Sequence, residues 1–358
     1  MLNFDGLDTH DIYMQRCLQL AELGMGNVAP NPMVGAVLVH EGKIIAEGYH
    51  MQYGKAHAEV NCINNVPAHL SQLIKESTLY VSLEPCNHFG KTPPCTDLII
   101  KYNIPNVVIA CTDPFEKVNG TGIKKLKEAS INIVTGILEK EALELNRRFF
   151  TFHQKKRPYI ILKWAQSNDE KIANADHSRV KISNELTNRL VHKWRSEEAA
   201  IMVGTKTALQ DDPSLTTRLW PGKDPVRVVI DKYLKLPATL NLFNKKNKTI
   251  ILNTIREETD GNNYYYKVAE EDSMIVAALN ILYKQQLTSL MVEGGTKLIQ
   301  SFIDANCWDE ARVITNKRLL IENGIPAPTL KDVVLFKKER LLTDEMCFYK
   351  NIVDMSLK

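Results

Sequence analysis

The chain has 358 residues, of which 44% are hydrophobic and 24% charged, the balance of a soluble globular protein. No apolar run approaches the ~18 residues that a membrane span needs, so we expect neither a membrane protein nor a membrane partner. The charge is uneven, because residues 1–150 hold 13 Lys and Arg against 16 Asp and Glu, whereas residues 151–358 hold 32 against 26. The mildly basic second half suits a phosphorylated ligand, although charge alone favours an ordinary solvated surface.

The length suggests two domains of ordinary size, each able to bury its own core. The polar and acidic N-terminal segment MLNFDGLDTHDIYMQRC predicts no signal peptide. Seven cysteines are scattered without the spacing of a disulfide framework. We therefore expect a cytoplasmic protein with reduced thiols, in which cysteines that come together are more readily metal ligands than disulfides.

The first 150 residues alternate helix and strand signals. Apolar spacing and turn residues predict helices over 8–25, 57–65, 95–103 and 122–129, a hairpin over 34–48, and strands over 78–85, 106–111 and 131–137. Strands that alternate with helices in this way predict an α/β domain over residues 1–150.

A charged segment that ends in a proline, residues 152–158, divides the chain, and the same rhythm then restarts. Strands are predicted over 159–165, 199–204, 225–231, 248–253 and 289–293, with a helix around Leu190 and another after the Gly294–Gly295 turn. The sequence contains no internal repeat, low-complexity segment or coiled-coil pattern. A second, different α/β domain is therefore expected over residues 151–358.

Four residues of the first half form a possible zinc site. His57, Cys86 and Cys95 are ligand types that zinc prefers, and three protein ligands would leave its fourth position open for water, whose pKa zinc lowers to about 7. Glu59, two residues after His57, could carry a proton without being a ligand, as in the zinc deaminases. Eight residues separate the cysteines where the general deaminase signature has two, but a longer loop costs little extra entropy to close.

A closed, structural zinc site is the alternative interpretation. His88 could be a fourth ligand, and Cys62 is another nearby thiol. The catalytic interpretation is favoured because a structural site has no use for Glu59.

Beyond these residues, the chain resembles a known family. APNPMVGAVLV (29–39), GYHMQYGKAHAE (48–59), SLEPCNHFGKTPPC (82–95) and TDPFEKVNGTGI (112–123) are similar to the deaminase domain of the bifunctional riboflavin-biosynthesis deaminase–reductases, a domain of the cytidine-deaminase-like superfamily. ILKWAQSNDEKIA, WRSEEAAIMVGTKTALQDDPSLTTR, PVRVVID and LMVEGG follow in the order of that family's reductase domain, whose fold resembles dihydrofolate reductase. The resemblance spans the chain apart from roughly its last forty residues.

The resemblance implies two linked reactions. The first half would hydrolyse an amino group of 2,5-diamino-6-(5-phosphoribosylamino)pyrimidin-4-one, with Zn²⁺ on His57, Cys86 and Cys95 and with Glu59 as the proton shuttle. The second half would use NADPH to reduce the ribosyl side chain of the product, 5-amino-6-(5-phosphoribosylamino)uracil, to ribityl. The expected partner is thus a small phosphoribosyl pyrimidine rather than a nucleic acid, and we expect a homo-oligomer, although the sequence itself does not define the oligomeric state.

The resemblance also assigns binding residues. In the deaminase half, the substrate contacts would be Asn31, His50, His88, Lys91 and Asp113. In the reductase half, NADPH would contact Ala165, Lys181, Thr207, Asp211, Gly294, Gly295 and Thr296, and the substrate would contact Lys163, Arg195, Leu215, Arg218 and Glu293. The residue types suit these roles, because a helix start after two glycines can approach a phosphate and an arginine fork can bind one bidentately.

The sequence departs from the family pattern at two places in the reductase half. The family's Ser-Leu-Asp-Gly is SNDE here, so that only Ser167 and Asp169 remain, and Lys181 replaces a tryptophan that lies against the cofactor. One alternative is therefore an active deaminase with an impaired reductase. The other two alternatives are a nucleic-acid base deaminase with an appended binding domain, and a non-catalytic zinc scaffold. The net negative first half and the 7% of aromatic residues count against nucleic acid.

Overall fold

The structure is a computed structural model that describes residues 9–90, 93–115, 119–176, 178 and 180–353. The chain forms two compact units that divide between Lys156 and Arg157. The charged segment 152–158 is predicted to divide the two domains, but helix α6 (Arg147–Lys155) runs through most of it. The helix forms there because Phe149 and Phe152 give it a buried apolar side. The domain boundary predicted after residue 150 therefore falls inside a helix.

The first unit is a three-layer α/β/α arrangement. Before α6, its elements are α1 (Thr9–Glu22), β1 (Gly35–His40), β2 (Lys43–Tyr49), α2 (Ala58–Asn64), the 3₁₀ helix η1 (Ala68–Glu76), β3 (Thr78–Val81), α3 (Cys95–Lys101), β4 (Asn106–Ile109), α4 (Thr121–Glu128), β5 (Asn132–Thr135) and α5 (Glu139–Leu145). All the elements predicted for residues 8–137 are present, with ends that differ by a few residues.

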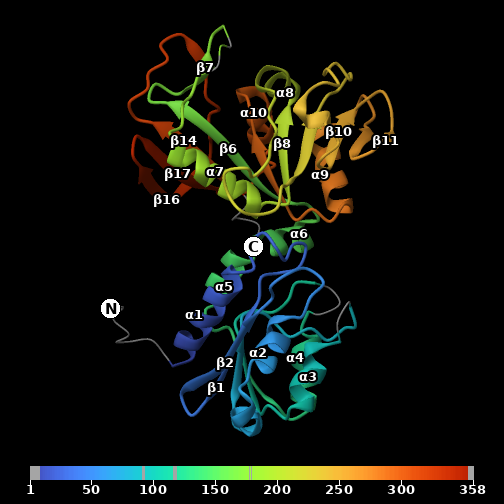
Figure 1. The fold of residues 1–358 in the computed structure, drawn as a ribbon, viewed down its shortest axis with the longest axis vertical. Helices are drawn as coiled ribbons and strands as arrows, with labels where there is room; N and C mark the ends of the chain where they lie inside the picture. Colours follow the sequence, from blue (N-terminus) through green and yellow to red (C-terminus); the bar gives the residue numbers. More distant parts are fainter. Residues whose placement is uncertain (1–8, 91–92, 116–118, 177, 179, 354–358) are drawn as a thin grey trace. The chain divides into compact units, whose positions relative to one another are not determined.

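The sheet of the first unit has the strand order β2-β1-β3-β4-β5. β1 runs antiparallel to both β2 and β3, whereas β3, β4 and β5 are parallel. One face packs on α2, α3 and α4 through a core that includes Leu79, Ile99 and Leu126, and the other face packs on α1 and α5 (Figure 1). Because helices join the parallel strands, the C-terminal end of β3 lies close to the first residues of α2 and α3. The predicted metal ligands lie at or near these element ends.

The second unit is also layered around one large sheet. Its elements are β6 (Tyr159–Ser167), β7 (Lys171–Asn174), α7 (Glu185–Glu197), β8 (Ala200–Gly204), α8 (Thr205–Asp211), β9 (Val226–Ile230), η2 (Asn241–Phe243), β10 (Thr249–Asn253), β11 (Glu258–Asp260), β12 (Asn263–Lys267), α9 (Met274–Lys284), β13 (Ser289–Glu293), α10 (Thr296–Asp304), β14 (Glu310–Asn316), β15 (Gly324–Pro326), β16 (Val333–Leu341) and β17 (Asp344–Asn351).

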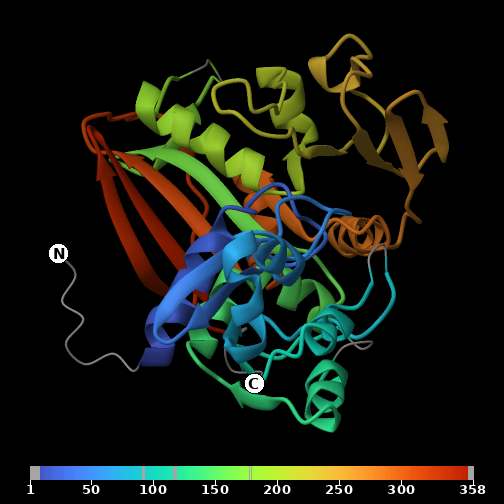
Figure 2. The ribbon, with the colours of Figure 1, turned by 60° about the horizontal axis from the view of Figure 1, so that its bottom comes forward.

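The large sheet has the order β11-β12-β10-β9-β8-β13-β6-β14-β17-β16, and β7 pairs separately with β15. β11 and β16 lie at its two ends (Figures 1 and 2). Helices α9 and α10 cover one face, whereas α7 and α8 cover the other. Roughly the last forty residues, which lie outside the family resemblance, thus form part of the large sheet. β17 pairs with β14, and β16 pairs with β17 at the end of the sheet.

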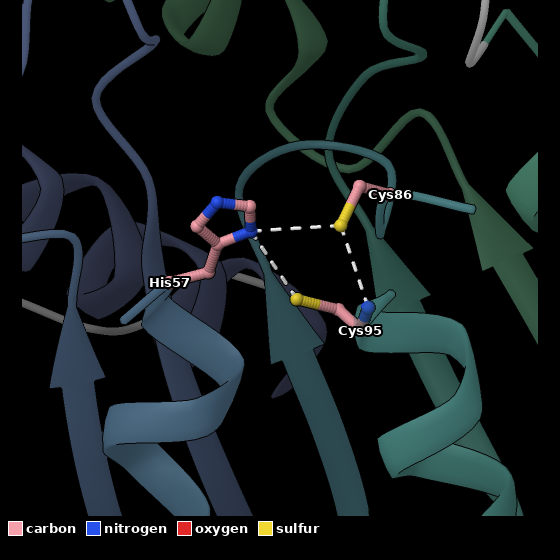
Figure 3. A group of neighbouring side chains, drawn as sticks. All are labelled: His57, Cys86 and Cys95. Carbon is pink, nitrogen blue, oxygen red and sulfur yellow. Dashed lines mark hydrogen bonds between the residues drawn. The ribbon is translucent and has the colours of Figure 1, made fainter. Parts of the chain in front are cut away.

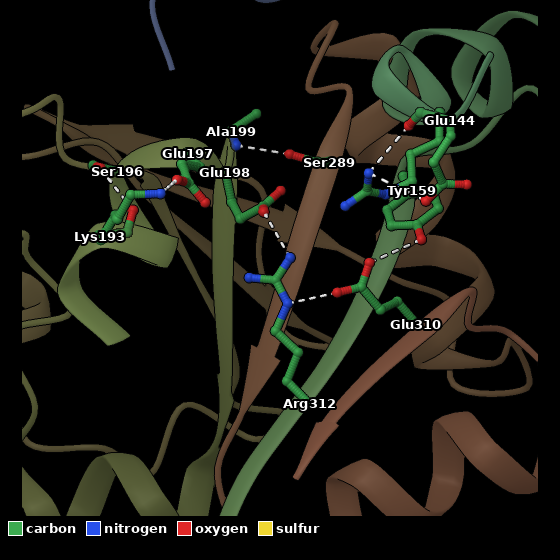
Figure 4. Close-up of polar contacts among 11 residues, drawn as sticks. Glu144, Tyr159, Lys193, Ser196, Glu197, Glu198, Ala199, Ser289, Glu310 and Arg312 are labelled. Carbon is green, nitrogen blue, oxygen red and sulfur yellow. Dashed lines mark hydrogen bonds and ion pairs between the residues drawn. The ribbon is translucent and has the colours of Figure 1, made fainter. Parts of the chain in front are cut away.

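A buried ion cluster links strand β14 of this sheet to the C-terminal end of helix α7. The Nε atom of Arg312 donates to Glu310 Oε1 at 2.6 Å, and its Nη2 lies 3.8 Å from Glu198 Oε1 (Figure 4). Its guanidinium also stacks over the Trp194 ring, with Cζ 4.9 Å from the centroid. The Tyr159 hydroxyl donates to Glu310 Oε2 at 3.1 Å. Buried charges need such partners, because an unpaired one is costly in a low-dielectric interior.

Among the described residues, no helix is both long enough and apolar enough to span a membrane.

Candidate active sites

Three side chains of the first unit converge as a metal-binding group. His57 Nδ1 lies 3.5 Å from Cys86 Sγ and 3.4 Å from Cys95 Sγ, and the ligand atoms of all three residues lie within 4.8 Å of one another (Figure 3). Two sulfurs and one imidazole nitrogen are a donor set that zinc prefers, and three protein ligands leave one tetrahedral position open. The residues present therefore fit a catalytic zinc ion.

Element ends place these three side chains. His57 is the extended residue just before α2, and Cys95 is the first residue of α3, as predicted, directly after Pro94. Cys86 follows β3, and its Sγ accepts a hydrogen bond from the Cys95 backbone amide at 3.4 Å. Both thiols therefore lie close together in spite of their wide spacing in the sequence.

Neither residue that could have closed the site joins the group. The His88 ring lies against Phe115, with centroids 5.7 Å apart, and Cys62 Sγ donates to the Ala46 carbonyl oxygen at 3.5 Å. In the described part of the chain, the only group of three or more possible ligands is His57, Cys86 and Cys95. The described residues thus do not form the four-ligand structural site.

Glu59 lies in the first turn of α2, two residues beyond His57, and only 3% of it is exposed. Burial, aided by the negative charge of Cys86 and opposed by His57, raises the pKa of Glu59 to about 6. A carboxyl group with that pKa can both accept and return a proton near neutral pH. This is the property that the predicted shuttle requires.

Asn31 and His50 form a hydrogen-bonded pair beside the metal group. The His50 ring lies edge-on to the His57 ring at 5.4 Å. Its Nδ1 must carry the proton, because that nitrogen is 3.0 Å from the Ala56 carbonyl oxygen, which can only accept. The His50 Nε2 then accepts from Asn31 Nδ2 at 3.2 Å. The two predicted substrate contacts are therefore adjacent, with the amide orientation fixed by the imidazole.

Two further predicted contacts, His88 and Asp113, both touch Phe115, His88 through its ring and Asp113 through the Phe115 backbone amide. The His88 Nδ1 atom is buried and has no hydrogen-bond partner among the described residues. Asp113 is buried, and its Oδ1 accepts from the Phe115 backbone amide at 2.8 Å. Burial raises the pKa of Asp113 to about 7. Lys91, the fifth predicted contact, lies outside the described residues.

In the second unit, Lys163, Arg195 and Glu293 form a buried charged triad. β6 and β13 are parallel, with Lys163 in register with Glu293, and Lys163 Nζ lies 3.6 Å from Glu293 Oε2. Arg195, on α7, donates two hydrogen bonds to the same carboxylate. Burial alone would raise the pKa of Glu293, but the two cations outweigh it and lower that pKa to about 2.

The Gly294–Gly295 turn is hydrogen-bonded to Thr207, another predicted cofactor contact. The Gly295 amide donates to Thr207 Oγ1 at 3.0 Å, and Gly294 has a φ of 133° that side chains rarely adopt. Helix α10 begins immediately afterwards at Thr296, whose hydroxyl donates to the Pro326 carbonyl oxygen. The structure thus joins Thr207, both glycines and a helix start, which together suit a phosphate.

The other predicted reductase contacts differ in exposure. Ala165 is half-buried on β6, Leu215 is buried with a φ of 53°, and Asp211 and Arg218 are exposed. Lys181 projects into solvent, where its Nζ lies 3.6 Å from Glu185 Oε1. That ion pair is an ordinary surface contact, so nothing in this geometry reproduces the stacking of the tryptophan that Lys181 replaces.

Sequence reasoning missed two buried residues. Glu84, in the SLEPC stretch, accepts hydrogen bonds from four backbone amides of residues 113–123. His192 lies one turn before Arg195 on α7 and is surrounded by the charges of Arg195, Arg218 and Glu293. The helical spacing could have indicated His192, whereas the partners of Glu84 are too distant in sequence for any local pattern to show.

Comparisons with known proteins agree with this division. Residues 7–111 match the family model of the cytidine and deoxycytidylate deaminase zinc-binding region, and residues 158–321 match that of the RibD C-terminal domain. The riboflavin biosynthesis protein RibD of Aquifex aeolicus is 39% identical over 317 residues, or 87% of each chain. That of Escherichia coli is 31% identical over 368 residues, which cover 95% of this chain and 98% of the relative.

Solved structures resemble both units together. A diaminohydroxyphosphoribosylaminopyrimidine deaminase/5-amino-6-(5-phosphoribosylamino)uracil reductase from Thermotoga maritima has a TM-score of 0.87 at 33% identity, covering 96% of this chain and 99% of that chain. Acinetobacter baumannii RibD has the same TM-score at 29% identity, covering 96% and 98%. The expected fold class, a cytidine-deaminase domain followed by a dihydrofolate-reductase-like domain, is confirmed. With identities of 30 to 40% over nearly its whole length, the chain belongs to the RibD family of bifunctional riboflavin-biosynthesis deaminase–reductases.

Proposed function

We propose that the first unit hydrolyses 2,5-diamino-6-(5-phosphoribosylamino)pyrimidin-4-one to 5-amino-6-(5-phosphoribosylamino)uracil and ammonia. The observation that carries this proposal is the three-ligand group of His57, Cys86 and Cys95 beside the buried Glu59. When bound there, zinc supplies a Lewis acid that activates water at neutral pH. Glu59 takes a proton from the attacking water and returns it to the departing amine, which leaves as ammonia while the ring carbon becomes a carbonyl.

The predicted substrate contacts support recognition of the pyrimidine and its phosphoribosyl arm. The Asn31 amide, whose Nδ2 donates to His50, presents its oxygen as an acceptor for a ring N–H. The buried His88 Nδ1, which no described residue bonds, and the buried Asp113 carboxyl lie on the neighbouring segments. A Lys91 ammonium would suit the phosphate.

We propose that the second unit then reduces the ribosyl side chain to ribityl with NADPH. The cofactor supplies a hydride, and a proton completes the new hydroxyl group, so the reaction is a two-electron reduction. The Gly294–Gly295 turn and Thr207 suit the cofactor phosphates, whereas Lys163 and Glu293 on adjacent strands suit the sugar. Lys163, on the strand next to that of Glu293, has its Nζ 3.6 Å from Glu293 Oε2. We assign Lys163 to the sugar oxygen.

One incubation tests both reactions. Zinc-loaded protein is given the diaminopyrimidinone ribotide, ammonia is measured, and NADPH oxidation is then followed. We expect Glu59→Gln to abolish ammonia release while it retains zinc and still oxidises NADPH when the deaminated intermediate is supplied. Absence of ammonia release by zinc-replete wild-type protein would rule out the deaminase, and absence of NADPH oxidation on supplied intermediate would support an impaired reductase. Ammonia release from a nucleic-acid base in preference to the ribotide would favour the rival deaminase.

We also propose that the chain is cytoplasmic and forms homo-oligomers. The cysteine content supports the first proposal, since none of the seven cysteines forms a disulfide. For the second, the end strand β16 exposes three consecutive apolar side chains, Val334, Leu335 and Phe336, each more than 40% exposed. A second copy is the occupant we assign to this surface. Light scattering should show an oligomer that Leu335→Asp dissociates, whereas a monomeric wild-type chain would contradict the proposal.

A further inference from the structure

Glu84 is a buried carboxylate that the proposed chemistry does not use. It lies between the end of β3 and Cys86, and only 3% of it is exposed. Its Oε2 accepts from the backbone amides of Asp113 at 3.2 Å and Gly120 at 3.0 Å, and its Oε1 accepts from those of Gly122 at 3.0 Å and Ile123 at 3.2 Å. Four amides on one carboxylate fill both of its oxygens, which is an unusually complete set of charge-assisted hydrogen bonds.

These bonds cap helix α4 from outside its own segment. The residue before the helix, Gly120, has a φ of 79° and no side chain to accept from the first-turn amides. The Glu84 carboxylate takes that place and puts a negative charge at the positive end of the helix. The Glu84 amide in turn donates to the Cys111 carbonyl oxygen at 3.0 Å. Glu84 therefore binds the described residues on both sides of positions 116–118, at Cys111 and Asp113 and again at Gly120 to Ile123.

The same segment also lies directly against the turn that carries the metal ligand. A Cβ atom on Gly122 would lie 2.2 Å from the Pro85 carbonyl oxygen, so only glycine permits this approach. Pro85 is the residue between Glu84 and Cys86. The position of the segment is thus set by contact with the metal-ligand turn on one side and by the Glu84 carboxylate on the other.

The fixed segment carries side chains that belong to the predicted substrate site. Asp113 is one of them, and its Oδ1 accepts from the Phe115 amide at 2.8 Å. The Phe115 ring lies between two imidazoles, with its centroid 5.7 Å from that of His88 and 5.1 Å from that of His153. The placement of His88, whose buried Nδ1 has no partner among the described residues, therefore depends on where Phe115 lies.

We infer that Glu84 is a positioning residue of the deaminase site, which fixes the described residues 111–115 and 119–123 so that Asp113 and, through Phe115, His88 are held in place for the substrate. This inference rests on the proposed deamination. It separates two tasks within one short stretch of chain, since Cys86 binds the metal and Glu84, two residues earlier, organises substrate recognition.

The test is a comparison of zinc content with deaminase kinetics in Glu84→Gln. The substitution keeps the size of the side chain but turns one acceptor oxygen into an N–H donor that faces two backbone amides. We expect about one zinc per chain, as in wild type, and a KM for the ribotide raised about tenfold or more, since small displacements of positioning groups have effects of that order. Glu128→Gln, on the exposed end of α4, is the matched control and should keep the wild-type KM.

If Glu84→Gln does not fold, a second pair of variants tests whether Phe115 holds His88 in place for the substrate. Phe115→Ala removes the ring that supports His88, whereas Phe115→Tyr retains it. We expect a raised KM in Phe115→Ala and its recovery in Phe115→Tyr, with NADPH oxidation on supplied intermediate unchanged in both. Loss of zinc from folded Glu84→Gln, or a wild-type KM in Glu84→Gln or Phe115→Ala, would overturn the inference. Failure of the proposed function would be distinct, because zinc-loaded wild type itself would then release no ammonia.

Discussion

The Arg195 guanidinium forms a two-point ion pair with the Glu293 carboxylate, with Nε 3.0 Å from Oε1 and Nη2 2.8 Å from Oε2. Its Nη1 donates to the Thr216 carbonyl oxygen at 3.4 Å. The fork that we expected to bind a substrate phosphate is thus directed at another protein group. In this geometry Arg195 orients Glu293 beside Lys163, whereas Arg218 is exposed.

Replacing Arg195 with lysine tests this role. Lysine retains the charge but cannot present two parallel donors, so Glu293 should lose its fixed orientation. We expect Arg195→Lys to slow NADPH oxidation on supplied intermediate about tenfold or more, with ammonia release unchanged. Arg189→Lys, on an exposed part of the same helix, is the control. An unchanged rate in Arg195→Lys would show that the charge alone suffices.

His192 should make the second unit sensitive to mild acid. Burial lowers the pKa of His192 to about 4, and the charges of Arg195 and Arg218 act in the same direction, outweighing Glu293. An unfolded histidine titrates near 6.5, so between pH 6.5 and 4 the unfolded chain binds a proton that the folded chain refuses. The free energy of unfolding should therefore fall as the pH drops through this window, by up to about 2 kcal/mol at pH 5.

Tryptophan fluorescence can measure this effect in one unit, because all four tryptophans follow Arg157. Denaturant unfolding at pH 7 and pH 5 should show a smaller loss of stability in His192→Gln than in wild type. The exposed His69→Gln should behave like wild type. Equal losses in wild type and His192→Gln would mean that His192 titrates normally in the folded chain.

The zinc site could be predicted from sequence because its chemistry needs particular residue types in short motifs. His57 and Glu59 are two residues apart, and Cys86 and Cys95 begin and end a single loop. Most strands could also be predicted, since buried strands such as β8 and β10 are continuous apolar runs.

Other features depend on contacts that no local pattern contains. Arg195 and Glu293 are 98 residues apart in sequence, and the carboxylate of Glu84 meets amides 29 to 39 residues later. The charges of residues 155–157 obscure helix α6 in the sequence, although Phe149 and Phe152 have helical spacing. Strand β16 has mostly exposed residues, so it lacks the apolar alternation by which strands are recognised.

The buried ion cluster around Arg312 predicts a large loss of stability for a single substitution. Arg312→Met would fill similar space but remove the Arg312 cation from beside the buried Glu310 and Glu198. Removing one partner of such a cluster costs about 3 kcal/mol or more. Unfolding followed by tryptophan fluorescence should show this decrease relative to Arg340→Met, an exposed control on β16. A decrease no larger than that of the control would mean that the carboxylates are solvated or protonated without cost.

The contact between Thr207 and the Gly-Gly turn gives the sharpest test of the cofactor site. Gly294 has a φ of 133°, and a Cβ atom there would lie 3.0 Å from Thr207 Oγ1, so Gly294→Ala meets both strain and crowding. We expect it to raise the KM for NADPH about tenfold, because the turn must move away from the start of α10. Thr207→Ser keeps the hydroxyl that accepts from the Gly295 amide and should preserve the KM, whereas the isosteric Thr207→Val should raise it. Equal KM values for NADPH in the serine and valine variants would place the dinucleotide away from this turn, since the only difference between the two that matters here is the acceptor for the Gly295 amide.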